Sequence, residues 1–304
     1  MAAPLPPLAL GDLASLVPSG GLRWIVLCRP AELLADETVR ALLATAFDGN
    51  RYDAFAEDTG VDLRRVERAV VAGFDASTSY LVRGGFDRAN VAARWRDRLV
   101  HGAAHASARE DVTRIRGDVG TTPETLLLLG AQVACFTVGG ELPARAAEAY
   151  ALDRLHAPRA LAGPPLASLV AHFGDAPLIA LAPGPFEQRW AHAARGLVGA
   201  ASAVGVALAP TSGRVGLRLG LAGVPREPGD RAVRLLRAAW DDLAAGPIGG
   251  LALRGCSAPT TSIEGDVVAL RSDLDAGTLG RGIAAALHLG IADIMREGSA
   301  SPGH

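Results

Sequence analysis

Two histidines have a spacing that could bind a metal ion. His101 and His105 stand four residues apart, so on a helix their imidazoles would lie on one face. A metal site needs three or four ligands, and no neighbouring H-E-x-x-H motif, acid triplet or cysteine completes this pair. We therefore expect no metal, and we interpret the two as histidines at the end of a helix, near its negative pole.

A cleft that binds a small ligand is the second kind of chemistry that the sequence allows. Arg83, His101, His105 and Arg271 each follow or end a predicted strand or helix. Side chains in such places can converge on a sheet face or on a cleft between domains. These four residues are therefore the candidate ligand residues.

No catalytic residue is identified. The sequence contains no lysine, so all 30 basic residues are arginines, and Schiff-base, PLP-anchoring, Walker-A and Ser-Lys chemistry are excluded. There is no G-x-S-x-G nucleophile elbow. The neighbouring acids, Glu57 with Asp58 and Asp241 with Asp242, would point in different directions on a helix, unlike the facing carboxylates of a glycosidase.

The cysteines and a glycine-rich run have structural interpretations. Cys28 and Cys135 lie in apolar strand-like runs, and with Cys256 they make an odd count without C-x-x-C spacing, so buried thiols are expected. The run at residues 280–285 has the form G-x-G-x-x-A, but it falls inside a predicted helix and does not follow a strand end. We expect close helix packing there and no cofactor.

Four tryptophans could line a ligand cavity or fill the core. Trp95, Trp190 and Trp240 fall at core-facing positions of predicted helices, and Trp24 falls in a predicted strand. We expect core packing. Two tryptophans facing an open cleft would favour ligand binding instead.

The elements that position these residues follow the order β-α-β-β-α-β in the first half. Strands are expected at residues 23–28, 66–74, 79–83 and 111–116. Helices are expected at residues 36–47 and 87–100, and residues 51–60 permit a short one. A hairpin at 125–129 and 132–138 and a helix at 143–155 complete this half.

The second half has the same expected order. Its strands are expected at residues 177–182, 202–209, 214–221 and 266–271, and its helices at 186–197 and 229–245. A final helix at 275–296 carries an apolar stripe and should pack against this half. The two halves also share similar strand-to-helix junctions at 81–87 and 181–187.

The predicted fold class is therefore α+β, with two tandem ferredoxin-like β-α-β-β-α-β halves, an added hairpin and a C-terminal helix. We divide the chain into a leader, a first half, a linker with at most one helical turn, a second half with the C-terminal helix, and a tail. Their bounds are 1–20, 21–157, 158–175, 176–297 and 298–304.

Composition limits the partners. Hydrophobic residues make up 49% of the 304 residues and the net charge is −2, which suits a large core and gives no sign of nucleic acid or an anionic membrane as partner. No run is long enough for a transmembrane helix. The N-terminus lacks the basic start of a signal peptide, so we expect either a cytoplasmic protein or a mature form whose signal was replaced by Met1.

The segment LVPSGGLRWIVLCRPAEL at residues 16–33 resembles the opening of uncharacterised exported or lipid-anchored two-repeat α+β proteins of GC-rich bacteria. The resemblance implies a place in the periplasm or at the outer membrane, no catalysis, and another envelope protein as partner. Two hypotheses follow: a non-catalytic cell-envelope scaffold or partner-binding protein, or a cytoplasmic enzyme or small-ligand sensor that uses the cleft between two ferredoxin-like domains. An exposed sheet edge would permit a homodimer without requiring it.

Overall fold

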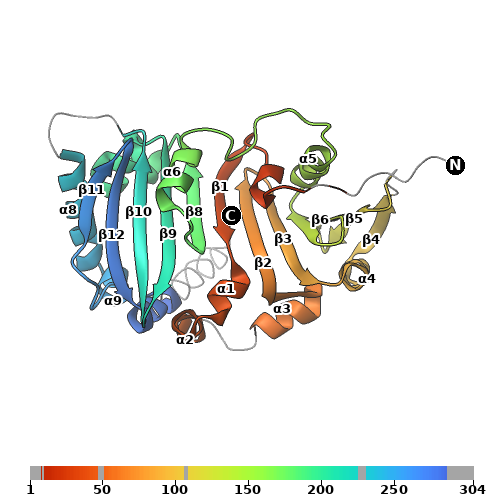
Figure 1. Cartoon of the computed structure of the whole chain (residues 1–304), viewed down its shortest axis with the longest axis horizontal. Coiled ribbons are helices and arrows are strands. Elements are labelled where there is room, and N and C mark those ends of the chain that lie inside the picture. The colour runs from red at the N-terminus through yellow and green to blue at the C-terminus, as the bar shows by residue number, and fades with distance from the viewer. Residues whose placement is uncertain (1–7, 9, 47–50, 106–108, 225–230, 286–304) are drawn as a thin grey trace, which may run out of the picture.

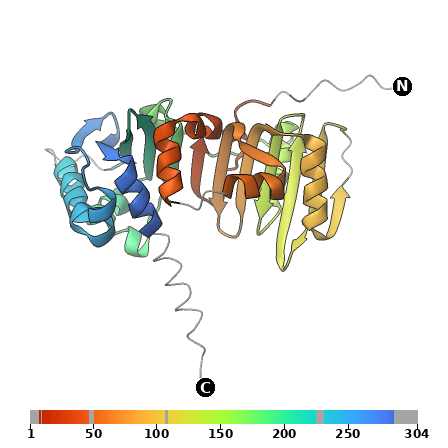
Figure 2. The same ribbon diagram turned by 90° about the horizontal axis from the view of Figure 1, so that it is seen from below.

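The apolar strand-like runs of the sequence pair into one antiparallel sheet. The computed structural model describes residues 8, 10–46, 51–105, 109–224 and 231–285. Its twelve strands have the order β11-β12-β10-β9-β8-β1-β2-β3-β7-β6-β5-β4, and helices lie on both sides of the sheet (Figures 1 and 2). The fold is therefore α+β, as predicted.

All ten predicted strands are present, and the two that sequence reasoning missed, β4 and β11, form the two edges of the sheet. The strands of the first half are β1 Leu22–Cys28, β2 Val61–Phe74, β3 Thr78–Phe86, β4 Val100–His105, β5 Val112–Val119, β6 Thr122–Leu129 and β7 Val133–Val138. Those of the second half are β8 Leu178–Pro183, β9 Ala203–Thr211, β10 Arg214–Ala222, β11 Thr260–Glu264 and β12 Val267–Asp275.

Helices connect and cover the strands. The labelled α-helices are α1 Pro30–Ala35, α2 Glu37–Ala46, α3 Arg51–Thr59, α4 Arg88–Arg98, α5 Leu142–Ala151, α6 Leu166–Phe173, α7 Leu197–Ala200, α8 Arg231–Ala245 and α9 Pro247–Ala252. Three short 3-10 turns are η1 Leu13–Leu16, η2 Gln188–Trp190 and η3 Ala193–Gly196. Residues 276–285 are helical directly after β12, where the Asp275 carboxylate accepts a hydrogen bond of 2.8 Å from the Thr278 N–H.

The sheet has two differently covered faces, because side chains alternate along each strand. On one face, which we call the α6 face, η1, α5 and α6 pack on a core that includes Leu13, Ala144 and Leu169. On the other, the α4 face, there are two separate clusters. One lies under α4 with Trp95, and the other lies under α2, α7 and α8 with Leu42 and Trp240.

The two halves meet where β1 pairs with β8, from Ile25↔Leu181 to Cys28↔Leu178. Helix α2 crosses this seam, and the core under α6 extends across it. Helix α6 packs on β8, β9, β10 and β12 within a core that also contains Ile25 of β1. Helix α2 belongs to the first half, yet its Leu42 is buried in the cluster of the second half. The halves therefore share their cores as well as one sheet.

The ferredoxin-like arrangement of each half is not confirmed. In a ferredoxin-like unit each β-α-β crossover joins two parallel strands that have another strand between them, whereas here the helix-linked strands β1 and β2, and likewise β8 and β9, are direct antiparallel neighbours. In each half the chain runs outward over three strands, crosses by a helix, and returns from the far edge to pair with the third strand, as β7 does with β3 and β12 with β10.

Three local expectations were wrong. Residues 158–175 contain the eight-residue helix α6, more than the single helical turn expected of a linker. The helix expected at 186–197 is broken into η2, η3 and α7, with positive φ angles at Ala194 and Arg195. The helix expected to run to residue 100 ends at Arg98, and the edge strand β4 follows. The final helix was expected to extend to 296, but residues 286–296 lie outside the described residues.

Candidate functional site

Helix α6 lies in a shallow trough that two glycines create. Gly205 of β9 and Gly220 of β10 are register partners on the α6 face. A Cβ atom on Gly205 would lie 2.5 Å from Cε2 of Phe173, and one on Gly220 would lie 2.9 Å from Cδ2 of Leu169. Only glycine lets the helix come this close to the sheet, so these two positions fix the place of α6.

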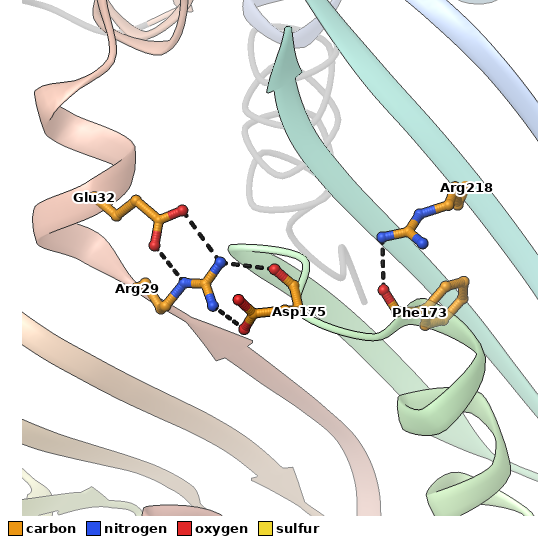
Figure 3. A network of polar contacts seen from close by, with 5 residues as sticks. All are labelled: Arg29, Glu32, Phe173, Asp175 and Arg218. Carbon is orange, nitrogen blue, oxygen red and sulfur yellow. Dashed lines mark hydrogen bonds and ion pairs between the residues drawn. The ribbon is translucent and has the colours of Figure 1, made fainter.

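The C-terminal end of α6 is held by an arginine from the sheet. The guanidinium of Arg218 on β10 donates a hydrogen bond of 2.6 Å to the carbonyl of Phe173, the last residue of the helix (Figure 3). A cation suits this position, because the last carbonyls of a helix are unpaired and carry partial negative charge. Gly174 then reverses the chain with a φ of 59°.

A second arginine ties the segment after α6 to the first half. Arg29, at the end of β1, pairs its guanidinium with the carboxylates of Asp175 and Glu32, and its Nη2 donates to the main-chain carbonyl of Asp175 at 2.7 Å (Figure 3). Its own N–H donates to the carbonyl of Pro177 at 2.9 Å. Only 12% of the Arg29 side chain is exposed. Arg29 therefore fastens the seam at one end.

The last turn of α6 also places a histidine in a charged cluster. His172 Nδ1 lies 3.3 Å from a carboxylate oxygen of Glu264 on β11. That carboxylate accepts hydrogen bonds of 2.7 and 3.0 Å from Arg271 on β12. Burial lowers the pKa of His172 below its ordinary 6.5; the charge of Glu264 opposes this shift, and those of Arg271 and Arg218 add to it.

On the α4 face, the middle of the sheet carries an apolar surface that we call the central strip. It is made of six residues on β1, β2, β3, β8 and β9: Trp24, Val26, Val71, Tyr80, Ala180 and Val206. Trp24 is 40% exposed and Tyr80 is 42% exposed. None of the six belongs to the three buried clusters that the described residues form.

Helices cover the sheet on both sides of the central strip. Phe136, the register partner of Tyr80, packs against Trp95 of α4 with ring centroids 5.1 Å apart. Leu219, the partner of Val206, belongs to the cluster under α2 and α8. Within the described part of the chain, the strip thus lies between the two helical layers of the α4 face and belongs to neither.

The structure does not bring the four candidate ligand residues together. Arg83 on β3 donates hydrogen bonds to the carbonyls of Leu10 and Gly11, so it holds the N-terminal segment in place. Arg271 lies on β12 in the other half, in the cluster with His172. His101 and His105 lie on the edge strand β4 and not at a helix end, and a strand does not place residues i and i+4 side by side.

His172, Arg218 and Glu264 were missed by sequence reasoning because residues 158–175 were interpreted as a linker. The sequence does contain a pattern that predicts this helix. Apolar residues recur at helical spacing in Leu166 to Phe173, and Gly174 follows as a helix terminator. This pattern predicts an amphipathic helix with His172 in its last turn.

The other residues of interest are structural. Burial raises the pKa of Cys28 and of Cys135 to about 11, so both are protonated, unreactive thiols at neutral pH. A Cβ atom on Gly282 would lie 2.3 Å from that of Ala252, so this glycine serves close packing against α9. Trp95 and Trp240 are buried as predicted, whereas the prediction of core packing was wrong for Trp24 and Trp190, which are 40% and 59% exposed.

Among the residues that the structure describes, no group of three histidine, cysteine or acidic side chains is arranged to hold a metal ion. Over the same residues, no helix has the length and apolar character needed to cross a bilayer.

The fold defines a class: an α+β protein built on one long antiparallel sheet with helices on both faces. No protein-family model and no curated protein matches the amino-acid sequence. Solved structures of TP0453 do share the fold. Crystal forms I and III both superpose with a TM-score of 0.56 at 11% identity, and form IV with 0.53 at 13%. Each covers 91% of this chain and at least 98% of TP0453.

Proposed function

We propose that this chain is a non-catalytic partner-binding protein of the cell envelope and that the central strip receives the partner. The observation that carries the proposal is the exposure of Trp24 and Tyr80 within an otherwise apolar row of the sheet. Exposed apolar patches of this kind mark interaction sites, and aromatic side chains supply much of the binding energy at interfaces. The envelope location rests on the resemblance of residues 16–33.

The shape of the surroundings favours a helix as the bound segment. The central strip spans five neighbouring strands, which is about 20 Å at the usual strand spacing. A helix is about 10 Å wide, so the strip is wide enough to receive one helix. An amphipathic helix of the partner would extend the helical layer of the α4 face and bury its own apolar stripe.

We also infer that the two halves repeat one plan, although not the ferredoxin-like one. Counted outward from the seam, β1, β2, β3 and β7 correspond to β8, β9, β10 and β12. The helices that follow the third strand, α4 and α8, cover the same face of the sheet and carry the buried Trp95 and Trp240. The central strip then lies at the join of two equivalent units.

Photo-crosslinking tests the proposed surface. A benzoyl-phenylalanine at position 80 should give an adduct with one envelope protein on irradiation of living cells, and Trp24→Ser should lower its yield. The control position is 142, because Leu142 is 76% exposed and lies on α5, on the opposite face. Adducts at both positions, or at neither, would contradict the proposal.

Two other results of the crosslinking experiment would favour a different function for the strip. Crosslinking at position 80 to a second copy of this chain would identify a homodimer surface. Recovery of a small molecule bound to the strip would favour the ligand-sensor hypothesis. Fractionation of the cells tests the location separately: protein recovered wholly with the cytosol would contradict an envelope role, whatever the strip binds.

A further inference from the structure

We propose that His172 is a pH-sensitive latch: in its neutral form it holds the C-terminal end of α6 on the second half of the sheet, and its protonation releases that end. The inference concerns the α6 face and is independent of the central strip. It rests on the surroundings of the His172 imidazole.

One nitrogen of His172 has a partner and the other has none. Nδ1 faces the Glu264 carboxylate at 3.3 Å, so Nδ1 carries the hydrogen of the neutral ring. Nε2 is then the nitrogen with the lone pair. It is fully buried and has no hydrogen-bond partner within the described structure, and the whole side chain is 5% exposed. A proton added at Nε2 would create a buried N–H donor with no acceptor, which is costly.

The charges around the ring do not compensate an imidazolium. The charged groups facing His172 are Glu264 from β11, Arg271 from β12 and Arg218 from β10. Glu264 is the one anion of this set, and it is already paired with Arg271 through two hydrogen bonds. The parts of β8 and β9 that pack under α6, such as Ile179 and Gly205, are uncharged. A protonated His172 would therefore be a buried cation close to two arginines.

The direction of the pH effect follows from linkage. Since burial lowers the pKa of His172 in the closed state, the open state takes up the proton more readily. The closed state is fully favoured above about pH 6.5, the ordinary pKa of histidine. The free energy that favours the closed state falls as the pH drops from 6.5 to the lowered pKa of His172. Below that pKa this free energy no longer changes with pH. Within this window the opening equilibrium rises about tenfold per pH unit.

Opening would have a defined structural consequence. Phe173 would leave the trough above Gly205 and Gly220, and the Arg218 bond to its carbonyl would break. The segment that follows is tied to Arg29 of the first half through Asp175. Release of α6 therefore uncovers apolar residues on the α6 face and loosens one fastening of the seam.

Hydrogen exchange of the full chain tests the latch. Amides of residues 166–175 should lose protection between pH 7.5 and 5.0, after correction for the intrinsic exchange rate, whereas those of β6 and β7 should not. In His172→Gln the protection should no longer depend on pH. His192→Gln is the matched control, because it removes a histidine outside the cluster, and it should behave as the wild type.

A second variant separates a titrating role from a merely structural one. The charge of Glu264 raises the pKa of His172, so Glu264→Gln should extend the loss of protection to lower pH. If His172→Gln does not fold, an NMR titration of the wild-type imidazole decides. A His172 pKa at or above 6.5, protection that does not change with pH, or an equal change in His172→Gln would each overturn the proposal.

Discussion

At the scale of single residues, two arginines hold the C-terminal end of α6 and the segment that follows it. Arg29 and Arg218 each donate to a main-chain carbonyl at the end of α6, from opposite sides of the seam. Because a guanidinium has several donors in a fixed geometry, Arg29 contacts Glu32 and Asp175 at the same time. The absence of lysine from the sequence makes arginine the only strong cation for such roles.

Arg29→Met should destabilise the protein by about 1–3 kcal/mol, because the nearly buried side chain loses its hydrogen bonds to the Asp175 carbonyl and to two carboxylates. Asp175→Asn should cost less than about 1 kcal/mol, since the Asp175 carboxylate is exposed and the carbonyl bond remains. Urea unfolding of both variants measures how much each lowers the free energy of unfolding. Equal losses would show that the ion pair, and not the carbonyl bond, fastens the seam.

Residue chemistry was only partly predictable. The spacing of His101 and His105 suggested a shared helix face, but α4 ends before them, and the polar residues around them gave no sign of an edge strand. Arg271 was selected because it ends a predicted strand, and it does join a charged cluster. Its neighbours His172 and Glu264 come from segments that the sequence pattern did not bring near it.

At the scale of elements, the position of α6 depends on the trough below it. Gly205→Ala should destabilise the protein by about 1–3 kcal/mol, because the new methyl group would overlap the ring of Phe173 and the side chain of Leu181. Gly163→Ala is the control, with no atom within 4 Å of the added Cβ, and it should change stability by less than about 0.5 kcal/mol.

A double mutant tests that the overlap with Phe173 is the cause. Phe173→Leu removes part of the ring, so its effect combined with Gly205→Ala should be smaller than the sum of the two single effects. Thermal unfolding of the four proteins gives this coupling. Strict additivity would mean that the Gly205 substitution acts elsewhere, for example on Leu181.

The strands inside the sheet were predictable from the sequence, and the two edge strands were not. The inner strands have apolar runs such as LLLL in β6 and AVVA in β2, whereas β4 reads VHGAAH and β11 reads TTSIE. An edge strand packs against fewer neighbours, so its composition carries less of the apolar signal. The helix expected at 186–197 failed for another reason: Ala194 and Arg195 adopt positive φ angles that composition does not reveal.

At the scale of the whole molecule, the shared cores predict one unfolding transition. Versions that keep only Trp95 or only Trp240 report on the first and the second half, and their fluorescence midpoints in urea should coincide. Leu42→Ala in α2 should lower both midpoints together, by an amount that corresponds to about 2–5 kcal/mol, because this first-half residue is buried in the second half. Two separate midpoints would contradict this shared stability.

The two-part organisation of the sequence was visible, but the way in which the parts join was not. Periodicity marks β1 and β8 as strands, yet it cannot show that they pair, because pairing depends on residues far apart in the chain. For the same reason the expected cleft between two domains could not be checked from the pattern. In the structure β1 and β8 are hydrogen-bonded neighbours, and one core on the α6 face contains residues of both, such as Ile25 and Ile179.

The pairing of β1 with β8 also sets an order of events during synthesis. Among the described strands β1 precedes all the others, but its partner on one side, β8, is made only after β2 to β7. Until then the nascent first half has an unpaired, apolar strand edge at Ile25 and Leu27. Such an edge invites pairing with other chains, and long-range strand pairing is slow. The first half is therefore open to pairing with other chains until β8 has been made.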